Sequence, residues 1–243
     1  KNPEISGTDQ VERNPFDIEL KNINVANPYL FQSDNHWAWF KRLRDEDPVH
    51  YCMDSEFGPY WSVTRYHDIM YVDTNHEIYS SEPAIVISDP DENFMLPMFI
   101  AMDRPKHDEQ RQIVSPAVGT EKLRYFEPTI RARTCEVLDR LPTTDSFDWV
   151  REVSIELTTR MLATLFDFPF EDRGKLTHWS DIATAIPGLG LIESEEERQT
   201  ELLECLEYFT RLWNERVTAA PQNDFISMLA HGEATRNMEP MEY

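Results

Sequence analysis

One stretch of the sequence decides how the rest is interpreted, and it consists of Phe99-Ile100-Ala101-Met102-Asp103-Arg104-Pro105-Lys106-His107-Asp108-Glu109-Gln110-Arg111. Pro105 suits the first turn of a helix, so His107 and Arg111, four residues apart, would share one face of the helix that follows. Arg111 is always cationic and binds carboxylates through a rigid fork of N–H donors, and His107 can donate from one or both ring nitrogens. The spacing therefore predicts a clamp for a ligand with two carboxylates, although it is also typical of solvated helix faces.

The charge of the chain supports an anionic ligand at this stretch. The 243 residues include 45 acidic and 23 basic side chains, which gives a formal net charge of −22. Such a charge repels phosphate backbones and anionic membranes, so we expect no nucleic-acid partner. Residues 104–140 differ, because they carry eight Lys and Arg against six Asp and Glu. This is the part of the chain that could attract an anion.

The cysteines and the apolar runs indicate the compartment. Cys52, Cys135 and Cys205 lie far apart and form no Cys-x-x-Cys pair, so neither a disulfide framework nor a structural zinc site is expected. Inside helices or strands such cysteines are usually small buried hydrophobes. No apolar run approaches the roughly 18 residues of a spanning helix, and no secretory pattern begins the sequence. We expect a cytoplasmic protein without a transmembrane segment.

Two acid–histidine pairs have the spacing of metal ligands. They are Asp47-x-x-His50 and Asp73-x-x-His76, each at the boundary of an expected element. Isolated Asp and His side chains are mostly exposed, so we interpret both pairs as ordinary surface residues and expect no metal-ligating residue.

Hydrophobic periodicity predicts a mainly α-helical fold with a small antiparallel sheet near the N-terminus. Residues 1–28 are polar and contain three prolines, which predicts an extended arm before a single domain over residues 29–243. A helix should run from Asn35 until Pro48 stops it. A hairpin of residues 49–53 and 60–64 and a short helix over residues 66–73 should follow. After Pro105 the pattern is helical, with stripes over residues 123–141, 150–165, 171–184, 194–213 and 224–230.

Two apolar loops interrupt this pattern. Residues 77–102 form a long irregular segment that contains Ile85-Val86-Ile87, and residues 186–192 join two expected helices through Ile186-Pro187-Gly188-Leu189-Gly190-Leu191-Ile192. Long ordered loops are usually functional, so these loops could line a pocket for an apolar ligand. The alternative is that both loops bury against neighbouring helices.

The stretch around His107 and Arg111 resembles the start of helix C in the cytochrome P450 superfamily of haem-thiolate monooxygenases, and the resemblance extends from Asn27 to the C-terminus. It implies the cytochrome P450 fold and a haem cofactor, iron protoporphyrin IX. It also implies that His107 and Arg111 bind the two haem propionates and that Ile100 and Met102 lie close to the haem edge. Arg104 departs from the family, which usually has a proline at that position.

Two further segments narrow the resemblance. Residues 147–150, Phe-Asp-Trp-Val, and residues 155–169, Ile-Glu-Leu-Thr-Thr-Arg-Met-Leu-Ala-Thr-Leu-Phe-Asp-Phe-Pro, are similar to bacterial terminal hydroxylases of medium-chain alkanes and fatty acids. This implies an alkane or fatty acid substrate, and ferredoxin and ferredoxin reductase as electron donors. The expected docking patch for the donor consists of Arg104, Lys106, Lys122 and Arg124, whose alternative role is a solvated surface. The expected pocket residues are Ile85, Val86, Ile186, Leu189 and Leu191.

The resemblance also shows which parts of the family's domain do not occur in the sequence. The cysteine ligand loop, the E-x-x-R helix and the central oxygen-activating helix are not found. We therefore expect the N-terminal portion of the domain, with no catalytic residue of its own and no activity alone. The alternative is a non-enzymatic helical protein that binds a lipid or another hydrophobic molecule. A coding sequence that continues past Tyr243 into a cysteine loop would favour the enzyme.

Overall fold

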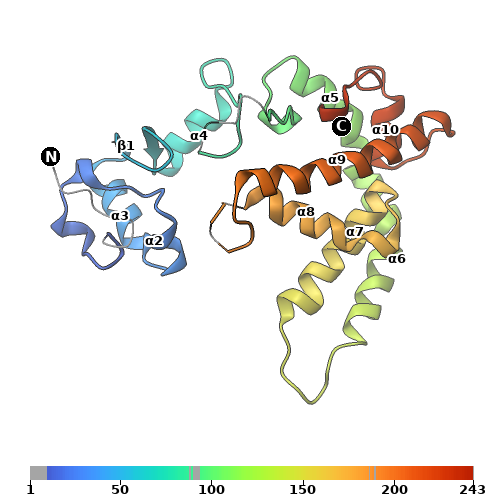
Figure 1. Ribbon diagram of the computed structural model, residues 1–243, viewed down its shortest axis with the longest axis horizontal. Coiled ribbons are helices and arrows are strands. Elements are labelled where there is room, and N and C mark those ends of the chain that lie inside the picture. Colours follow the sequence, from blue (N-terminus) through green and yellow to red (C-terminus); the bar gives the residue numbers. More distant parts are fainter. Residues whose placement is uncertain (1–9, 88, 90–93, 186, 189, 243) are drawn as a thin grey trace. The chain divides into compact units, whose positions relative to one another are not determined.

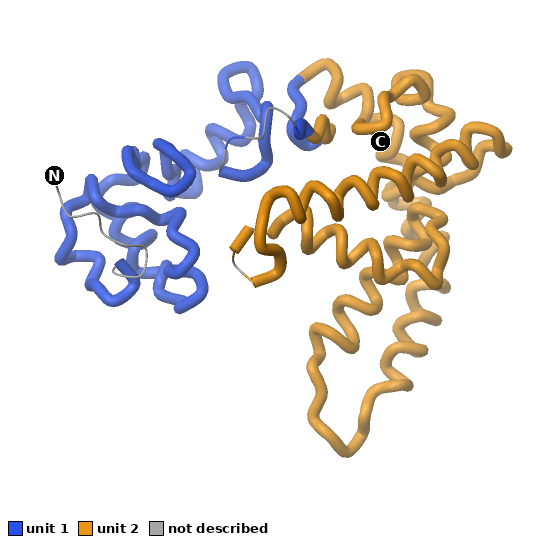
Figure 2. The backbone as a smooth tube through the Cα atoms, viewed as in Figure 1, with its two compact units in different colours: residues 1–95, 100–103 blue, residues 96–99, 104–243 orange. Residues whose placement is uncertain are grey.

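The chain forms two compact units, which the computed structural model describes over residues 10–87, 89, 94–185, 187–188 and 190–242. One unit comprises Lys1–Met95 and Ile100–Asp103, and the other comprises Leu96–Phe99 and Arg104–Tyr243 (Figure 2). The described residues are mostly helical and contain a two-stranded antiparallel sheet. The expected fold class is confirmed.

The first unit follows the predicted order of a helix, a hairpin and a second helix. Helix α3 (His36–Glu46) ends just before Pro48, which cannot continue it. Strands β1 (Val49–Cys52) and β2 (Tyr60–Val63) pair antiparallel, with Val49 opposite Val63. Gly58, whose φ of 81° suits a residue without a side chain, closes the turn between them. Helix α4 (Tyr66–Thr74) follows, and three short helices precede α3, namely η1 (Pro15–Asp17), η2 (Leu20–Asn22) and α2 (Pro28–Gln32).

Residues 10–28, which the sequence predicts to be an extended arm, are instead packed against α3. Ile18, Ile23 and Val25 are buried with Trp39 and other apolar side chains of this unit. Arg42 of α3 donates to the backbone carbonyls of Pro15 and Ile18, and this holds the first short helix in place. The sequence does not predict this packing, because the apolar residues of the segment are scattered and follow no sustained helix or strand period. The boundary at residue 28 stays a prediction.

The second unit is a set of packed helices. Helices α8 and α9 lie side by side, as do α6 and α7, and α10 packs against both α9 and α5 (Figure 1). Its long helices are α5 (Lys106–Val114), α6 (Thr120–Leu138), α7 (Glu156–Phe166), α8 (Gly174–Thr184), α9 (Glu195–Thr218) and α10 (Phe225–His231), and its short ones are η4 (Ser115–Val118), η6 (Phe170–Asp172) and η7 (Pro240–Glu242). The predicted helical stripes are all present.

The helix ends of this unit follow from local chemistry. Ser194 caps α9 by accepting a hydrogen bond from the Glu197 backbone N–H at 3.2 Å, as its position before the acidic run predicts. Asp224 caps α10 in the same way, from Ser227 at 2.8 Å. Asp167 adopts a left-handed conformation with φ of 48° and ends α7 before Pro169. The sequence did not predict that α7 is preceded by a π-helix, η5 (Val150–Ile155).

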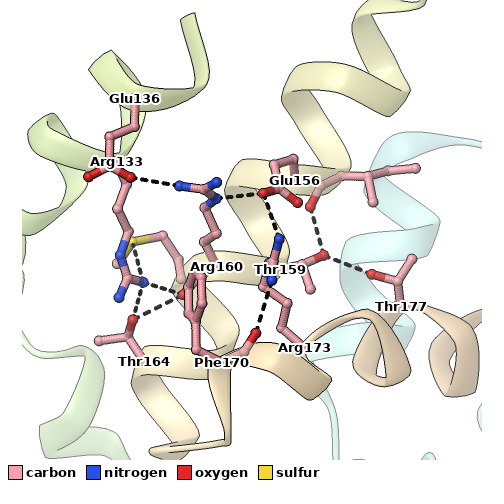
Figure 3. A network of polar contacts seen from close by, with 11 residues as sticks. Arg133, Glu136, Glu156, Thr159, Arg160, Thr164, Phe170, Arg173 and Thr177 are labelled. Carbon is pink, nitrogen blue, oxygen red and sulfur yellow. Dashed lines mark hydrogen bonds and ion pairs between the residues drawn. The ribbon is translucent and has the colours of Figure 1, made fainter. Parts of the chain in front are cut away.

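A polar network around the buried Arg160 joins α6, α7 and η6 (Figure 3). The Arg160 side chain is only 3% exposed, and its guanidinium contacts Glu156 at 2.6 Å and Glu136 at 2.9 Å. Arg173 reaches the same Glu156 oxygen at 3.0 Å. The Phe170 ring lies under the guanidinium groups of Arg160 and Arg173, 5.6 and 4.5 Å from its centroid. Buried guanidinium groups need such partners, so the network fixes how these three elements pack.

Acid should weaken this network through Glu156. Burial alone would raise the pKa of this carboxyl, but hydrogen bonds from Arg160 and Arg173 outweigh it and lower the pKa below its ordinary value of 4.5. A carboxyl with a lowered pKa in the folded state adds stability above its unfolded-state pKa and loses it as the pH falls through the folded-state pKa. We expect the free energy of unfolding, measured with urea, to decrease as the pH is lowered below 4.5. This decrease per pH unit should be smaller in Glu156→Gln than in the unchanged chain. Identical slopes would contradict this role.

Candidate functional site

Helix α5 places the two predicted ligand-binding side chains on one face. It begins at Lys106, directly after Pro105, as the sequence predicts, so His107 and Arg111 are one helical turn apart. Asp108 lies next to them and uses both carboxylate oxygens. One oxygen is 3.0 Å from His107 Nδ1 and the other is 2.9 Å from Arg104 Nε. Arg104, the departure from the usual proline, therefore holds the carboxylate that orients the His107 ring.

This geometry leaves donors free for a ligand. His107 Nδ1 contacts the Asp108 carboxylate, and Nε2 has no hydrogen-bond partner among the described residues. The Phe99 ring lies 6.1 Å from the imidazole, centroid to centroid, and limits its movement. Arg111 is exposed and makes no side-chain hydrogen bond or ion pair with any described residue. An exposed guanidinium and an imidazole with an unpaired Nε2, one helical turn apart on the same face, fit a pair of carboxylates.

Ile100 and Met102 belong to the first unit, whereas His107 and Arg111 belong to the second. Ile100 is 59% exposed and can contact a ligand, whereas Met102 is buried. Asp103 fixes this segment by accepting hydrogen bonds from Ser80 Oγ at 2.6 Å and from the Ser81 backbone N–H at 2.9 Å. These bonds lower the pKa of Asp103.

The apolar loops are open to solvent where the structure describes them. Ile85 and Val86 are more than half exposed, and so is Leu191. The alternative that these side chains bury against neighbouring helices is therefore wrong for these three. Ile186 and Leu189, also predicted to line the pocket, lie outside the described residues.

The loop that carries Leu191 has a defined anchor. Ile192 is 2% exposed, and its carbonyl accepts a hydrogen bond from the Gly188 backbone N–H at 2.8 Å. Gly188 and Gly190 have φ of 79° and 103°, a conformation that side-chain-bearing residues rarely adopt. The glycines thus permit a tight turn that holds Ile192 inside and leaves Leu191 outside.

The predicted docking cations have different surroundings. Lys106 is paired with Glu242, and Arg104 with Asp108. The Lys122 ammonium lies 5.1 Å from the centroids of both the Tyr125 and Phe126 rings. Arg124 is exposed and has no ion pair with a described residue. Of the four, Arg124 is the one whose charge is most available to an acidic partner.

His50 corrects a prediction, because it is buried rather than exposed. It is 1% exposed, with Nδ1 2.7 Å from Asp47 and Nε2 3.0 Å from the Ile23 carbonyl. The Asp47-x-x-His50 spacing therefore corresponds to a structural contact, and the same ring also binds the packed N-terminal segment through Ile23. Within the described part of the chain, no three His, Cys, Asp or Glu side chains gather to hold a metal.

The cysteines are free, and they differ in exposure. Cys52 is buried, as expected for a small hydrophobe, and burial raises its pKa. Burial also raises the pKa of Cys205, to about 11, which keeps it a thiol at neutral pH. Cys135 is exposed, which corrects the prediction of burial for this residue: it lies on the outer side of α6. No described helix is long and apolar enough to cross a membrane.

Comparisons with known proteins agree with the resemblance drawn from the sequence. No family model matches the chain. Linalool 8-monooxygenase of Pseudomonas putida is 26% identical over 225 residues, which cover 88% of this chain and 55% of the relative. A methyl-branched lipid omega-hydroxylase of Mycobacterium bovis is 25% identical and covers 73% of this chain and 44% of the relative. The chain spans about half the length of these relatives.

Solved structures match more closely. CYP153D17 from Sphingomonas sp. PAMC 26605 superposes with a TM-score of 0.79 and 45% sequence identity, covering 88% of this chain and 55% of the other. Cytochrome P450-153 from Novosphingobium aromaticivorans gives a TM-score of 0.77 and 40% identity, covering 95% and 57%. Such relatives are monooxygenases that use haem, iron protoporphyrin IX, as their cofactor. The fold, the sequence relatives and the solved structures agree that this chain belongs to the cytochrome P450 superfamily.

Proposed function

We propose that the chain forms the haem-propionate clamp and part of the substrate pocket of an enzyme that hydroxylates terminal C–H bonds of medium-chain alkanes or fatty acids. The observation that carries the proposal is the face of α5 on which His107 and Arg111 lie one turn apart and can both donate hydrogen bonds to carboxylates. The haem would supply the oxygen chemistry once bound, with electrons from ferredoxin and ferredoxin reductase. The work of the chain is to hold the cofactor and orient the substrate.

His107 and Arg111 would each bind one propionate. The Arg111 fork can form two parallel N–H···O bonds with a carboxylate. A His107 imidazolium would have both nitrogens as donors, Nδ1 to Asp108 and Nε2 to the propionate. Arg104 then acts indirectly, because it fixes Asp108. The exposed Ile100 side chain would contact the apolar edge of the macrocycle, as would Met102 if its burial is relieved.

The substrate class is supported by the apolar loops. Ile85, Val86 and Leu191 present aliphatic side chains to solvent, and none offers a hydrogen bond. A hydrocarbon chain has no polar groups to satisfy, so apolar contact alone must hold it. Ile186 and Leu189 belong to the same proposal. One of the relatives is named a methyl-branched lipid omega-hydroxylase, and a lipid is a substrate with a hydrocarbon chain.

The 243-residue chain alone would be inactive, and we propose that it works as the front portion of a longer domain. Within it, the Cys205 thiol has a raised pKa, Cys52 is buried, and Cys135 lies on a helix rather than in a ligand loop. The unpaired cysteines favour a cytoplasmic setting. Arg124, with Arg104, Lys106 and Lys122 nearby in sequence, would attract an acidic ferredoxin.

Titration of the haem-loaded full-length protein with hydrocarbons tests the substrate class. We expect alkanes or fatty acids of medium chain length to change the haem absorption spectrum. Leu191→Asn should raise the apparent Kd about tenfold, because a partly buried leucine contributes about 1.4 kcal/mol to an apolar contact.

Leu203→Asn is the matched control for this experiment. Leu203 is comparably exposed, but it lies on α9 away from the loop, so its replacement should leave the Kd unchanged. A haem-loaded protein that responds to no such hydrocarbon would refute the substrate class. A protein that binds the hydrocarbon without haem would instead support the non-enzymatic hydrophobe-binding alternative.

A further inference from the structure

Helix α5 has two neighbouring faces with different surroundings. Lys106, Gln110 and Ile113 lie at positions i, i+4 and i+7 and share one face. His107 and Arg111 lie one residue further along, which rotates their face by about 100°. The first face is covered at Gln110, which is 3% exposed where α10 packs against α5, while the Lys106 side chain at its N-terminal end is 54% exposed. On the second face Arg111 is exposed and the His107 side chain is 25% exposed.

Gly232 allows α10 to approach the C-terminal half of α5 closely. A Cβ atom at this position would lie 2.7 Å from Ile113 Cγ2, 2.5 Å from Thr235 Oγ1 and 2.9 Å from the Met228 carbonyl. Two of these neighbours cannot move easily. The Met228 carbonyl belongs to the backbone, and Thr235 is fully buried, with its hydroxyl donating to the Leu229 carbonyl at 2.5 Å. A side chain at position 232 would clash with Ile113 of α5 and with two neighbours in its own segment, so the close contact between this segment and α5 could not persist unchanged.

The N-terminal end of α5 is held by a second contact. The Lys106 ammonium pairs with the Glu242 carboxylate, whose side chain is only 15% exposed. The other Glu242 oxygen accepts a hydrogen bond from the Glu239 backbone N–H at 3.1 Å. The Lys106 contact, helped by the backbone bond, lowers the pKa of Glu242, so the carboxylate stays charged at neutral pH.

The two contacts lie at opposite ends of the same helix face. Ile113 is seven residues after Lys106, a rise of about 10 Å along the axis. Contacts at two such points restrain both sliding of the helix and its rotation about its axis. The rotation of α5 decides where the donors of its open face point.

We infer that Gly232 and Glu242 are positioning residues for the haem clamp. They fix the rotation of α5 and thereby direct His107 Nε2 and the Arg111 guanidinium at the propionates. The inference rests on the proposed haem role of these two donors. It assigns the segment from α10 to η7 to cofactor retention, although none of its residues would touch the cofactor.

A charge-swap cycle in the full-length haem-loaded protein tests the ion pair. Lys106→Glu and Glu242→Lys, each alone, should raise the haem dissociation rate about fivefold, the change that corresponds to losing about 1 kcal/mol. The double variant restores an ion pair with reversed sign and should return the rate to within about twofold of the unchanged protein. An effect of either new side chain that does not depend on the ion pair would not be reversed in this way. Gly232→Ala should raise the rate at least as much as either single variant.

Lys175 and Glu204 supply the control. They form an exposed ion pair between α8 and α9 at 2.6 Å, so the same swaps there should leave haem dissociation unchanged. If the double variant at 106 and 242 loses haem as fast as the singles, or if the control swaps lose it equally, the positioning role is overturned. If instead the proposed function is wrong, the unchanged full-length protein will hold no haem, so the two kinds of failure can be told apart. Should Gly232→Ala fail to fold, the charge-swap cycle still decides the question.

Discussion

Replacing both His107 and Arg111 by alanine in the full-length protein is expected to raise the haem dissociation rate about a hundredfold. Each side chain would contribute a charge-assisted hydrogen bond to a propionate, worth about 1.5 kcal/mol. Together they account for about 3 kcal/mol, or two powers of ten. The rate can be measured by transfer of haem to an excess of apomyoglobin.

The single variants and a control make this result specific. Arg111→Lys keeps the charge but loses the rigid fork, so it should fall between the unchanged protein and Arg111→Ala. Arg124→Ala removes another exposed arginine, on α6, and should leave the rate unchanged. A double alanine variant that retains haem like the unchanged protein would refute the propionate assignment.

Replacing Arg160 by methionine is expected to have the largest effect on stability. The change removes a guanidinium that is almost fully buried and leaves Glu136 and Glu156 without their shared partner. Breaking a buried ion pair from one side costs about 3 to 5 kcal/mol, and because Glu136 is 56% exposed and Glu156 keeps Arg173, we expect the lower end, about 3 kcal/mol. Urea unfolding at neutral pH measures the difference.

Arg211→Met is the matched control for Arg160→Met. Arg211 pairs with Glu215 one helical turn along α9 at 3.2 Å, but both side chains are about half exposed. An exposed pair of this kind contributes less than about 1 kcal/mol, so the control should be close to neutral. Equal losses in the two variants would mean that burial of the Arg160 network contributes nothing of its own.

Elements of the fold that depend on neighbouring residues could be predicted from the sequence. Pro48 ends α3, Ser194 and Asp224 cap their helices, and the alternating runs around Gly58 form the hairpin. Each of these signals acts within one or two turns of the chain. Contacts between distant segments could not be predicted in this way. Burial of His50 depends on the Ile23 carbonyl, 27 residues earlier, and nothing at position 50 indicates it.

The same division holds at the candidate site. The spacing of His107 and Arg111 on one helix predicted a shared face, and α5 has that face. The contact between Lys106 and Glu242 spans 136 residues, and the close approach at Gly232 depends on the packing of α10 against α5. Sequence patterns record the periodicity of each helix but not the partner that covers each face. Gly232 itself offers only a weak signal, since a glycine directly after a helix usually marks the helix end.

The absorption spectrum of the reduced full-length protein under carbon monoxide tests the assignment to haem binding most directly. We expect a haem complex with the band typical of a thiolate ligand, and its loss in parallel with haem when His107 and Arg111 are both replaced. A folded full-length protein without haem absorption, or with a complex that lacks the thiolate band, would contradict the assignment.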